Sequence, residues 1–481
     1  MGHTNTTRMA EEKKNKEIWP IWVTDIEEEY ESYDPSEYVL KLERKCIYRW
    51  PNDLVITSSL SKHRTPHMAS LGPYHHRKEH LQPMEHHKKR ALYRILKRSG
   101  VSLYCFLDSL KGIEQELRDS YDNLEPKLPT DSFLRMMLLD GCFILEILRS
   151  SCISNENWFD AFEPIFSRFG KLTMTLAFRD MLLLENQIPL RVLRKLLEVE
   201  ERRETSDDAY LNNLICDFYC FESLSIHGPA LHILDIYRKC LIMDSTMEEQ
   251  TTASVEGFIK SVCMRYEPWL HVIGKGIKRM LLGIPIFVFR LLSKQINKPG
   301  NMRSAMRFHE AGVEFKKAKP CSGLKITFDE EHGVLTLPFI VVDVNTAAIY
   351  MNLMAFERMH PKLRNPEVTS YVSFMIDLID TAEDVSLLCS RGIVMNLLGS
   401  DERAANVFNK MGDGITYSLD DELYEQLQSY VASDWNAARA NLNRNYFQNP
   451  WSILSLLAAI VLLVLTSIQT LFSVLAVKNG K

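Results

Sequence analysis

Apolar residues recur at helical spacing along most of the 481-residue chain, and this periodicity predicts a mainly α-helical protein with a multi-helix globular body. Residues 133–150 are apolar on nearly every side, so the helix that they predict should be buried all round. Residues 175–197 repeat this pattern, but Pro189 lies near their middle and predicts a kink or a break there. A run rich in β-branched residues at 333–343 predicts one or two short strands around Pro338.

The same pattern divides the chain into five parts. The first part is acidic and poor in apolar residues, so we expect a mostly disordered arm. Next come an N-terminal helical part, a variable segment that combines basic and apolar residues, a C-terminal helical part, and an uncharged apolar stretch. In this order the parts are residues 1–43, 44–245, 246–305, 306–448 and 453–477.

The stretch from Ile453 to Val477 contains no charged residue. At a rise of about 1.5 Å per residue, a helix of this length spans a hydrocarbon layer roughly 30 Å thick, whereas a buried core helix is usually shorter. We therefore predict a single transmembrane helix that contacts membrane lipid. The N-terminus lacks an apolar signal segment, so we expect the N-terminal bulk to be cytosolic, with the plasma membrane favoured over endomembranes. Ser455, Ala459 and Gln469 could support pairing of two such helices and hence a homo-oligomer.

The variable segment contains a second apolar run, residues 280–292, which is interrupted by Gly283, Pro285 and Arg290. It is too short to span a bilayer. Two interpretations remain open, a core helix with solvated basic flanks and a segment that rests on an anionic membrane surface.

Composition excludes several classes of protein. The net charge is −5, and no basic stripe interleaved with aromatic residues is present, so we expect no nucleic-acid partner. The ten cysteines are scattered and contain no CxxC pair, which predicts free, partly buried thiols in a reducing compartment.

Histidine is concentrated in one short region, and two interpretations follow. Zinc would need three or four ligands on one centre, and the spacing matches neither HExxH nor a Cys/His pattern. We therefore favour a hydrogen-bonded structural loop and predict no metal site. The histidines of this region are His63, His67, His75, His76, His80, His86 and His87.

Four carboxylates lie inside very apolar predicted helices: Asp140, Glu146, Asp180 and Glu185. Paired acids in such surroundings could perform acid–base catalysis, but buried acids more often bind a neighbouring Arg or a backbone N–H. Arg149 and Arg179 are suitable partners. The chain contains no nucleophile elbow, P-loop, dinucleotide-binding or kinase motif. We therefore predict a non-enzymatic protein with no catalytic residue and no cofactor.

Several short motifs occur in an order that resembles the plant-specific family called domain of unknown function 247. They begin with Leu-Gly-Pro-Tyr-His-His at 71–76, continue through 84–88, 136–146, 179–189, 232–235, 312–315 and 352–357, and end with Asn-Pro-Trp at 449–451. The residues of these motifs that we single out, with a structural or unknown role, are Gly72, Pro73, Tyr74, His75, His76, Glu85, Lys88, Asp140, Glu146, Arg179, Asp180, Glu185, Asn186 and Gln187. Arg49-Trp50-Pro51 departs from the Val-Pro that is common in such proteins, and His63, His67, His80 and His87 are not part of the pattern.

The resemblance implies a membrane-anchored plant protein with no established activity or cofactor. Our leading hypothesis is non-enzymatic protein–protein recognition or signalling with an unidentified protein partner, whose specificity would lie in residues 1–43 and 246–305. One alternative is a pollen-side self-incompatibility determinant of the grass type. The other is an unrecognised hydrolase or transferase that uses the buried acids or the His75/His76 loop.

Overall fold

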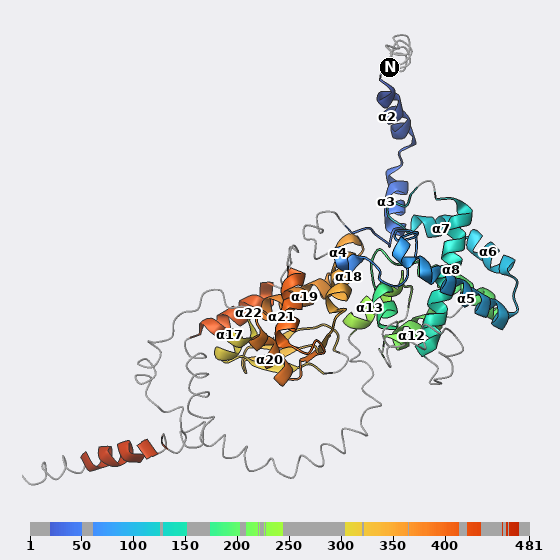
Figure 1. Ribbon diagram of the computed structural model, residues 1–481. Coiled ribbons are helices and arrows are strands. Elements are labelled where there is room, and N and C mark those ends of the chain that lie inside the picture. The colour runs from blue at the N-terminus through green and yellow to red at the C-terminus, as the bar shows by residue number, and fades with distance from the viewer. Residues whose placement is uncertain are drawn as a thin grey trace, which may run out of the picture.

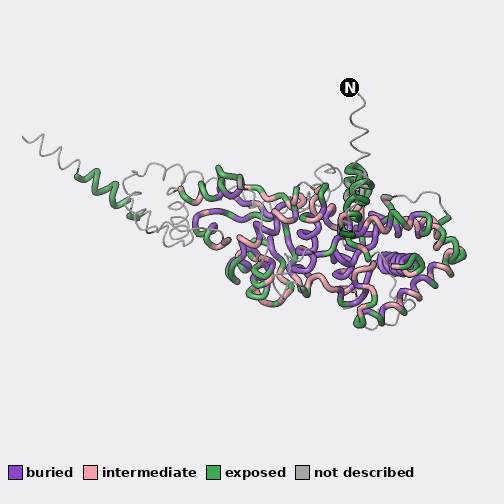
Figure 2. Tube along the Cα trace, turned by 90° about the horizontal axis from the view of Figure 1, so that it is seen from above, coloured by how far each residue is buried: buried purple, intermediate pink, exposed green. Residues whose placement is uncertain are grey.

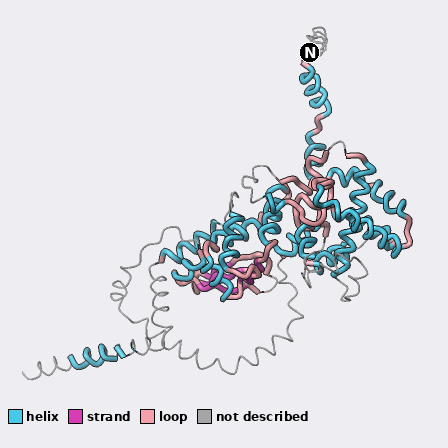
Figure 3. Tube along the Cα trace, viewed as in Figure 1, coloured by secondary structure: helices cyan, strands magenta, loops and turns pink. Residues whose placement is uncertain are grey.

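A computed structural model shows how these segments are arranged (Figure 1). It describes residues 20–50, 61–125, 128–151, 174–202, 208–219, 221, 226, 228–243, 304–319, 322–363, 365–412, 421–433, 455, 458–459 and 461–470. The described body has a helical lobe, residues 61–243, and a mixed lobe, residues 304–433, whose strands lie together at one end (Figure 3).

The helical lobe is built around α8 (Thr130–Ser151), the helix that the sequence predicts to be buried all round. Helices α5 (Gln82–Ser99), α6 (Leu103–Lys111), α11 (Leu190–Glu201) and α12 (Asp208–Phe218) pack against it. Gly141 permits the close approach of α11, because a Cβ there would lie 2.5 Å from Leu196 Cδ1. The prediction of a buried central helix is confirmed.

Shorter elements complete this lobe. They are α4 (Ser61–Arg64), η2 (Glu79–Leu81), α7 (Glu114–Asp119) and α13 (Ile233–Ile242). The predicted break at Pro189 is also confirmed, because helical residues 174–180 lead into a turn and Pro189 is the N-cap of α11.

The mixed lobe contains two small sheets. In the first, β3 (Val334–Leu337) lies between β1 (Glu314–Lys317), which is parallel to it, and β2 (Thr327–Asp329), which is antiparallel. In the second, β4 (Ile340–Val342) pairs in parallel with β5 (Val394–Asn396). The strands predicted around Pro338 are therefore β3 and β4, whereas β1, β2 and β5 were not predicted.

Six helices belong to the mixed lobe. They are α17 (Ala305–Glu310), α18 (Thr346–Met359), α19 (Glu367–Leu378), α20 (Ala382–Ser390), α21 (Asp401–Gly412) and α22 (Asp421–Ala432).

The two lobes share one continuous hydrophobic core, seen as the buried interior in Figure 2. Contacts of α4 with α18 and of α13 with α19 join them. A buried ion pair reinforces this junction, since Arg238 Nε of α13 lies 2.7 Å from Glu357 Oε1 of α18. The Glu357 carboxylate also accepts hydrogen bonds from the N–H groups of Val368 and Thr369 at the start of α19.

Two helices lie in the described part of the N-terminal arm. Residues 20–44 form α2 (Ile21–Ser32) and α3 (Pro35–Arg44), which project from the helical lobe (Figure 1). Residues 1–19 lie outside the described residues, as do 244–303, which include the basic and apolar run at 280–292.

The prediction of a transmembrane helix from Ile453 to Val477 is wrong on the evidence of the described residues. Of that stretch the structure describes residues 455, 458–459 and 461–470, which are helical. No helix in the described part of the chain is both long and apolar enough to cross a bilayer. The expectation of a single-pass membrane location with a cytosolic bulk is corrected accordingly, whereas lipid contact and pairing of two chains are not tested by this finding.

Removal of the Glu357 carboxylate tests the junction between the lobes. We expect Glu357→Ala to lower the free energy of unfolding by about 3–5 kcal/mol, because it leaves Arg238 buried without its partner. The double substitution Arg238→Met with Glu357→Leu should cost less than Glu357→Ala alone. Urea denaturation followed by circular dichroism measures both, and a Glu357→Ala protein as stable as the wild type would contradict the assignment.

Candidate functional site

Most of the singled-out residues surround one segment, residues 62–76, which we call the motif loop. It begins within α4 and ends shortly before η2, and its residues Met68 to Gly72 are buried. A buried loop leaves backbone N–H and C=O groups without water, so other parts of the protein must supply their hydrogen-bond partners.

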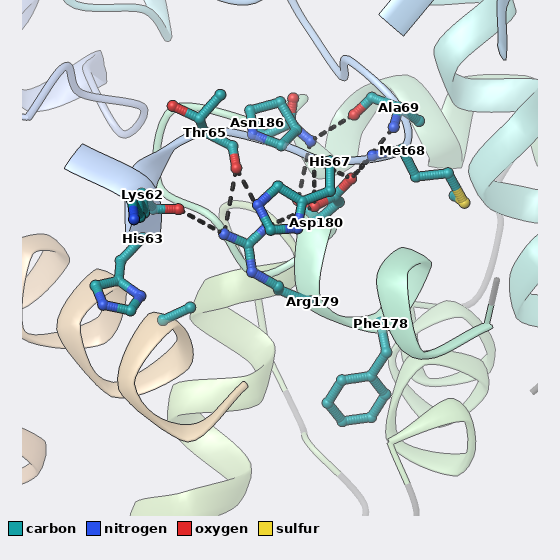
Figure 4. Close-up of polar contacts among 12 residues, drawn as sticks. Lys62, His63, Thr65, His67, Met68, Ala69, Phe178, Arg179, Asp180 and Asn186 are labelled. Carbon is teal, nitrogen blue, oxygen red and sulfur yellow. Dashed lines mark hydrogen bonds and ion pairs between the residues drawn. The ribbon is translucent and has the colours of Figure 1, made fainter. Parts of the chain in front are cut away.

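Arg179 and Asp180 supply the first set of partners (Figure 4). The Asp180 carboxylate accepts hydrogen bonds from the N–H groups of His67, Met68 and Ala69 at 3.0, 2.6 and 3.2 Å. The Arg179 guanidinium lies 2.8 Å from Asp180 Oδ1 and donates to the carbonyl oxygens of Lys62 and Thr65. The predicted pairing of these two neighbours is confirmed, and together they bind the first half of the motif loop.

Asn186 continues this pattern along the loop. Its Oδ1 accepts from the N–H of Leu71 at 2.7 Å, and its Nδ2 donates to the carbonyl oxygens of Ala69 and Asp180. One amide side chain therefore joins the motif loop to the turn that follows residues 174–180.

Asp140 and Lys88 bind the middle of the loop from two helices. Asp140 Oδ2 on α8 accepts from the N–H of Gly72 at 2.8 Å, and its Oδ1 lies 2.6 Å from Lys88 Nζ. Lys88, on α5, is fully buried and also donates to Glu85 Oε1 and to the carbonyl oxygen of Ser70. The ammonium thus has three oxygen partners, as a buried cation requires.

Glu185 contacts the end of the loop. Its Oε1 accepts from the N–H of Trp50 at 2.9 Å, and its Oε2 lies 3.3 Å from His75 Nε2. The His75 contact is a charge–dipole contact rather than a well-formed hydrogen bond, and His75 Nδ1 has no hydrogen-bond partner among the described residues. The neighbouring His76 is only half-buried.

Gln187, Gly72 and Tyr74 complete the arrangement. Gln187 Nε2 donates to the carbonyl oxygens of Met181 and Leu183, and its Oε1 accepts from the N–H of Leu234. Gly72 has a positive φ of +76°, and a Cβ there would lie 2.5 Å from the Gln187 carbonyl oxygen. Pro73 follows, and the hydroxyl of Tyr74 donates to the carbonyl oxygen of Ile47 at 3.1 Å.

Glu146 does not belong to this group. On α8 it accepts from Arg98 Nη2 at 2.5 Å and lies within 3.3 Å of Arg94 and Arg149, in a network that also includes Glu200 of α11. The predicted partner Arg149 is confirmed. The network joins α5, α8 and α11 inside the helical lobe.

Two buried polar residues have roles that the sequence did not predict. Asn352 Oδ1 on α18 accepts from Trp50 Nε1 and from the N–H of Leu184, while its Nδ2 donates to the His63 carbonyl oxygen. His232, the N-cap of α13, accepts from the N–H of Asp235 through Nδ1, and its Nε2 lies 3.0 Å from the Cys46 carbonyl oxygen. In both cases the available signal was a polar residue within an apolar run.

The histidines of the 63–87 region are dispersed. His67 contributes its N–H to Asp180, His80 Nε2 lies 3.2 Å from the Pro66 carbonyl oxygen, and the His86 and His87 rings contact each other edge to face. Within the described residues, no three His, Cys, Asp or Glu side chains are grouped so that they could hold a metal ion.

Burial is the largest influence on the pKa of each acid at the motif loop. It raises the pKa of Asp180 and Asp140, and the N–H groups, Arg179 and Lys88 offset this only in part. Burial also raises the pKa of Glu185, but the contacts with His75 and Trp50 outweigh it and leave the pKa below its usual value. The pKa of His75 is lowered by its burial, so the imidazole is neutral at neutral pH.

The side chains of this arrangement bind the protein's own backbone and hold the motif loop in place. Asp140, Asp180 and Glu185 each have backbone N–H donors as partners, and Glu146 is bound by arginines. A general acid or base needs a proton path to a substrate, whereas these oxygens face the protein's own backbone. We therefore treat the motif loop and its four clamping residues (Asp140, Asp180, Glu185 and Asn186) as the organising site of the fold.

Gly72→Ala tests the tight approach of the motif loop to Gln187. We expect a loss of about 2–5 kcal/mol in the free energy of unfolding, from left-handed backbone strain together with the contact between the new Cβ and the Gln187 carbonyl oxygen. Gly392→Ala is the matched control, since Gly392 has a similar φ of +68° but no heavy atom within 4 Å among the described residues. Urea denaturation of both variants separates the backbone strain from the contact with Gln187. Equal losses in the free energy of unfolding would contradict the importance of that contact.

His232 makes stability depend on pH. Burial lowers its pKa from 6.5 to about 4, so the unfolded chain binds a proton more readily than the folded one. Above pH 6.5 the neutral His232 does not reduce the free energy of unfolding. As the pH falls from 6.5 to about 4, proton binding by the unfolded chain lowers that free energy by roughly 3 kcal/mol in all. We expect His232→Asn, which can still accept from the Asp235 N–H, to lose less stability than the wild type over this range.

Urea denaturation at pH 7.5 and at pH 5.0 measures this difference for both proteins. Comparing the two proteins cancels the contributions of the other buried histidines. An identical loss of stability on acidification would show that His232 is not the group responsible.

Comparison with known proteins points to the same family as the sequence motifs. A UPF0481 protein of Arabidopsis thaliana, At3g47200, is 26% identical over 473 residues, covering 94% of this chain and 92% of the relative. A putative UPF0481 protein of the same plant, At3g02645, is also 26% identical, over 518 residues that cover 94% of each chain. No solved structure matches the chain significantly. The family model described as "Plant protein of unknown function" matches residues 47–465, and the chain therefore belongs to this plant family, DUF247.

Proposed function

We propose that this protein acts by non-enzymatic recognition of another protein, and that α2 is the element that makes the contact. The observation that carries the proposal is the exposed apolar face of α2. Trp22, Ile26 and Tyr30 follow each other at four-residue spacing and are 60%, 55% and 78% exposed. Residues four apart lie on one side of a helix, so these three side chains form a single stripe.

The rest of α2 indicates the chemistry of the partner. The helix carries five acidic residues and no Lys or Arg: Asp25, Glu27, Glu28, Glu29 and Glu31. An apolar stripe bordered by acids fits an apolar groove that is bordered by Lys or Arg on a protein partner. A helix of this length is marginal by itself in water, so burial of the stripe by a partner would stabilise it.

The base of the arm is firmly attached to the helical lobe. Arg44, the last residue of α3, lies 3.1 Å from Asp119, and Lys45 lies 2.6 Å from Asp122. The N–H groups of Cys46 and Ile47 both donate to the Ser120 carbonyl oxygen. This attachment supports a role for the body as a platform from which α2 is presented (Figure 1).

The geometry of the acids supports a non-enzymatic role. The hydrolase or transferase alternative requires at least two of them to converge on a space that a substrate can reach. Asp140, Glu146, Asp180 and Glu185 are all buried, and each is engaged by the protein's own donors. The pollen-side alternative stays a prediction, and the tissue that expresses the transcript tests it.

Site-specific photo-cross-linking tests the proposal in the full-length chain. A benzophenone amino acid at position 26, introduced in plant tissue, should cross-link to a protein partner that can then be identified and purified. The matched control carries the same group at Tyr104, which is 76% exposed but lies on α6. Equal products from both positions, or none from position 26, would contradict the role of α2.

The purified partner then allows the stated chemistry to be measured. We expect Trp22→Ala with Tyr30→Ala to weaken binding by about 30-fold or more, as for a buried aromatic anchor. Glu27→Lys with Glu31→Lys should weaken it most strongly at low salt. Tyr104→Ala should leave the affinity unchanged.

A further inference from the structure

Cys216 and Cys240 lie side by side in the core although they are 24 residues apart in the sequence. Cys216 is on α12 and Cys240 is on α13, and their Sγ atoms are 3.3 Å apart. The two residues are 1% and 4% exposed, and both are free thiols. The sequence contains no CxxC pair, so it did not predict that these two cysteines lie close together.

We propose that Cys216 and Cys240 form an oxidative cross-linking site that a small peroxide converts into a disulfide. This inference is independent of the proposed recognition function. In the first step the Cys216 thiolate attacks one oxygen of hydrogen peroxide, which gives a Cys216 sulfenic acid and releases water after protonation. In the second step the Cys240 sulfur attacks the Cys216 sulfur and displaces the second water. Two thiols and one peroxide thus yield one disulfide and two waters.

The geometry requires only a small adjustment. The Sγ atoms must approach by about 1.3 Å to reach the S–S bond length of roughly 2.05 Å. Because both side chains are buried, a small oxidant is better suited than glutathione disulfide. Either Sγ can be the donor in the contact between the thiols, and this contact lowers the pKa of Cys216, so we assign the first attack to Cys216.

The cross-link would act on the helix that joins the two lobes. Besides Cys240, α13 carries Arg238, which pairs with Glu357 of the mixed lobe, and Leu234, whose N–H donates to Gln187. A bond from α12 to α13 would therefore attach this joining helix covalently to the helical lobe. Closing a chain loop of this size also restricts the unfolded chain, so the oxidised protein should have the higher Tm.

Peroxide treatment of the reduced, full-length protein tests the site. After one equivalent of hydrogen peroxide and alkylation of the remaining thiols, peptide mapping without reduction should show Cys216 linked to Cys240. Cys216→Ala and Cys240→Ala should each abolish this product and the rise in Tm. Cys220→Ala is the matched control, because Cys220 is only four positions from Cys216, and it should leave both unchanged.

Three results would overturn the inference. Cys216 and Cys240 could both be alkylated after oxidation, the cross-link could map to Cys220 or to the exposed Cys105, or Cys216 could accumulate as a sulfinic acid without any link. Peptide mapping of the wild type alone distinguishes these results, so the test holds even where a variant folds poorly.

Discussion

The fold depends on one constraint, the burial of the motif loop's backbone. Each N–H or C=O group removed from water without a partner costs about 1–3 kcal/mol, which is a large fraction of the net stability of a domain. Asp180 alone satisfies three consecutive N–H groups, and Arg179 satisfies two carbonyl groups on the same segment. The hydrogen-bonding groups of the loop that Asp180 and Arg179 bind all belong to the backbone. The two charged residues therefore stabilise the backbone conformation of the loop, whatever its side chains are.

Buried carboxylates also bind backbone N–H groups in the mixed lobe. Asp384 accepts from the N–H groups of Met306, Asp380 and Thr381, so it binds the start of α17 and caps its own helix α20. Glu357 accepts from two N–H groups at the start of α19 while it pairs with Arg238. Helix N-termini present unpaired N–H groups and a partial positive charge, so a buried carboxylate is a suitable partner for them. The acids are thus distributed over the junctions between segments and are not collected at one reactive centre.

The parts of this arrangement that the sequence predicted are local. The buried helix α8, the break at Pro189 and the pairs Arg179–Asp180 and Arg149–Glu146 involve residues at most a few positions apart, where periodicity and spacing are informative. The partners of Asn352 and of His232 lie 302 and 186 residues away in the sequence, and no local pattern specifies such a contact. All five strands have only three or four residues, too few for alternation to be recognised, and only β3 and β4 lie in a run rich in β-branched residues that marks them. The expectation of a mostly disordered arm rested on its acidic composition and did not use the four-residue spacing of Trp22, Ile26 and Tyr30.

The proposal of recognition in place of catalysis rests on the contrast between the core and the arm. Catalysis needs polar groups that are oriented toward a substrate before it binds. Holding such groups in place costs free energy, which interactions in the rest of the fold must offset. Here the buried carboxylates already use their hydrogen-bonding capacity to hold the chain together, so substitution of any of them would first affect stability. The apolar stripe of α2, in contrast, contributes nothing to the core and gains free energy only when another surface covers it. A body stabilised in this way can tolerate changes in α2 without loss of its fold, as the proposed recognition role would require.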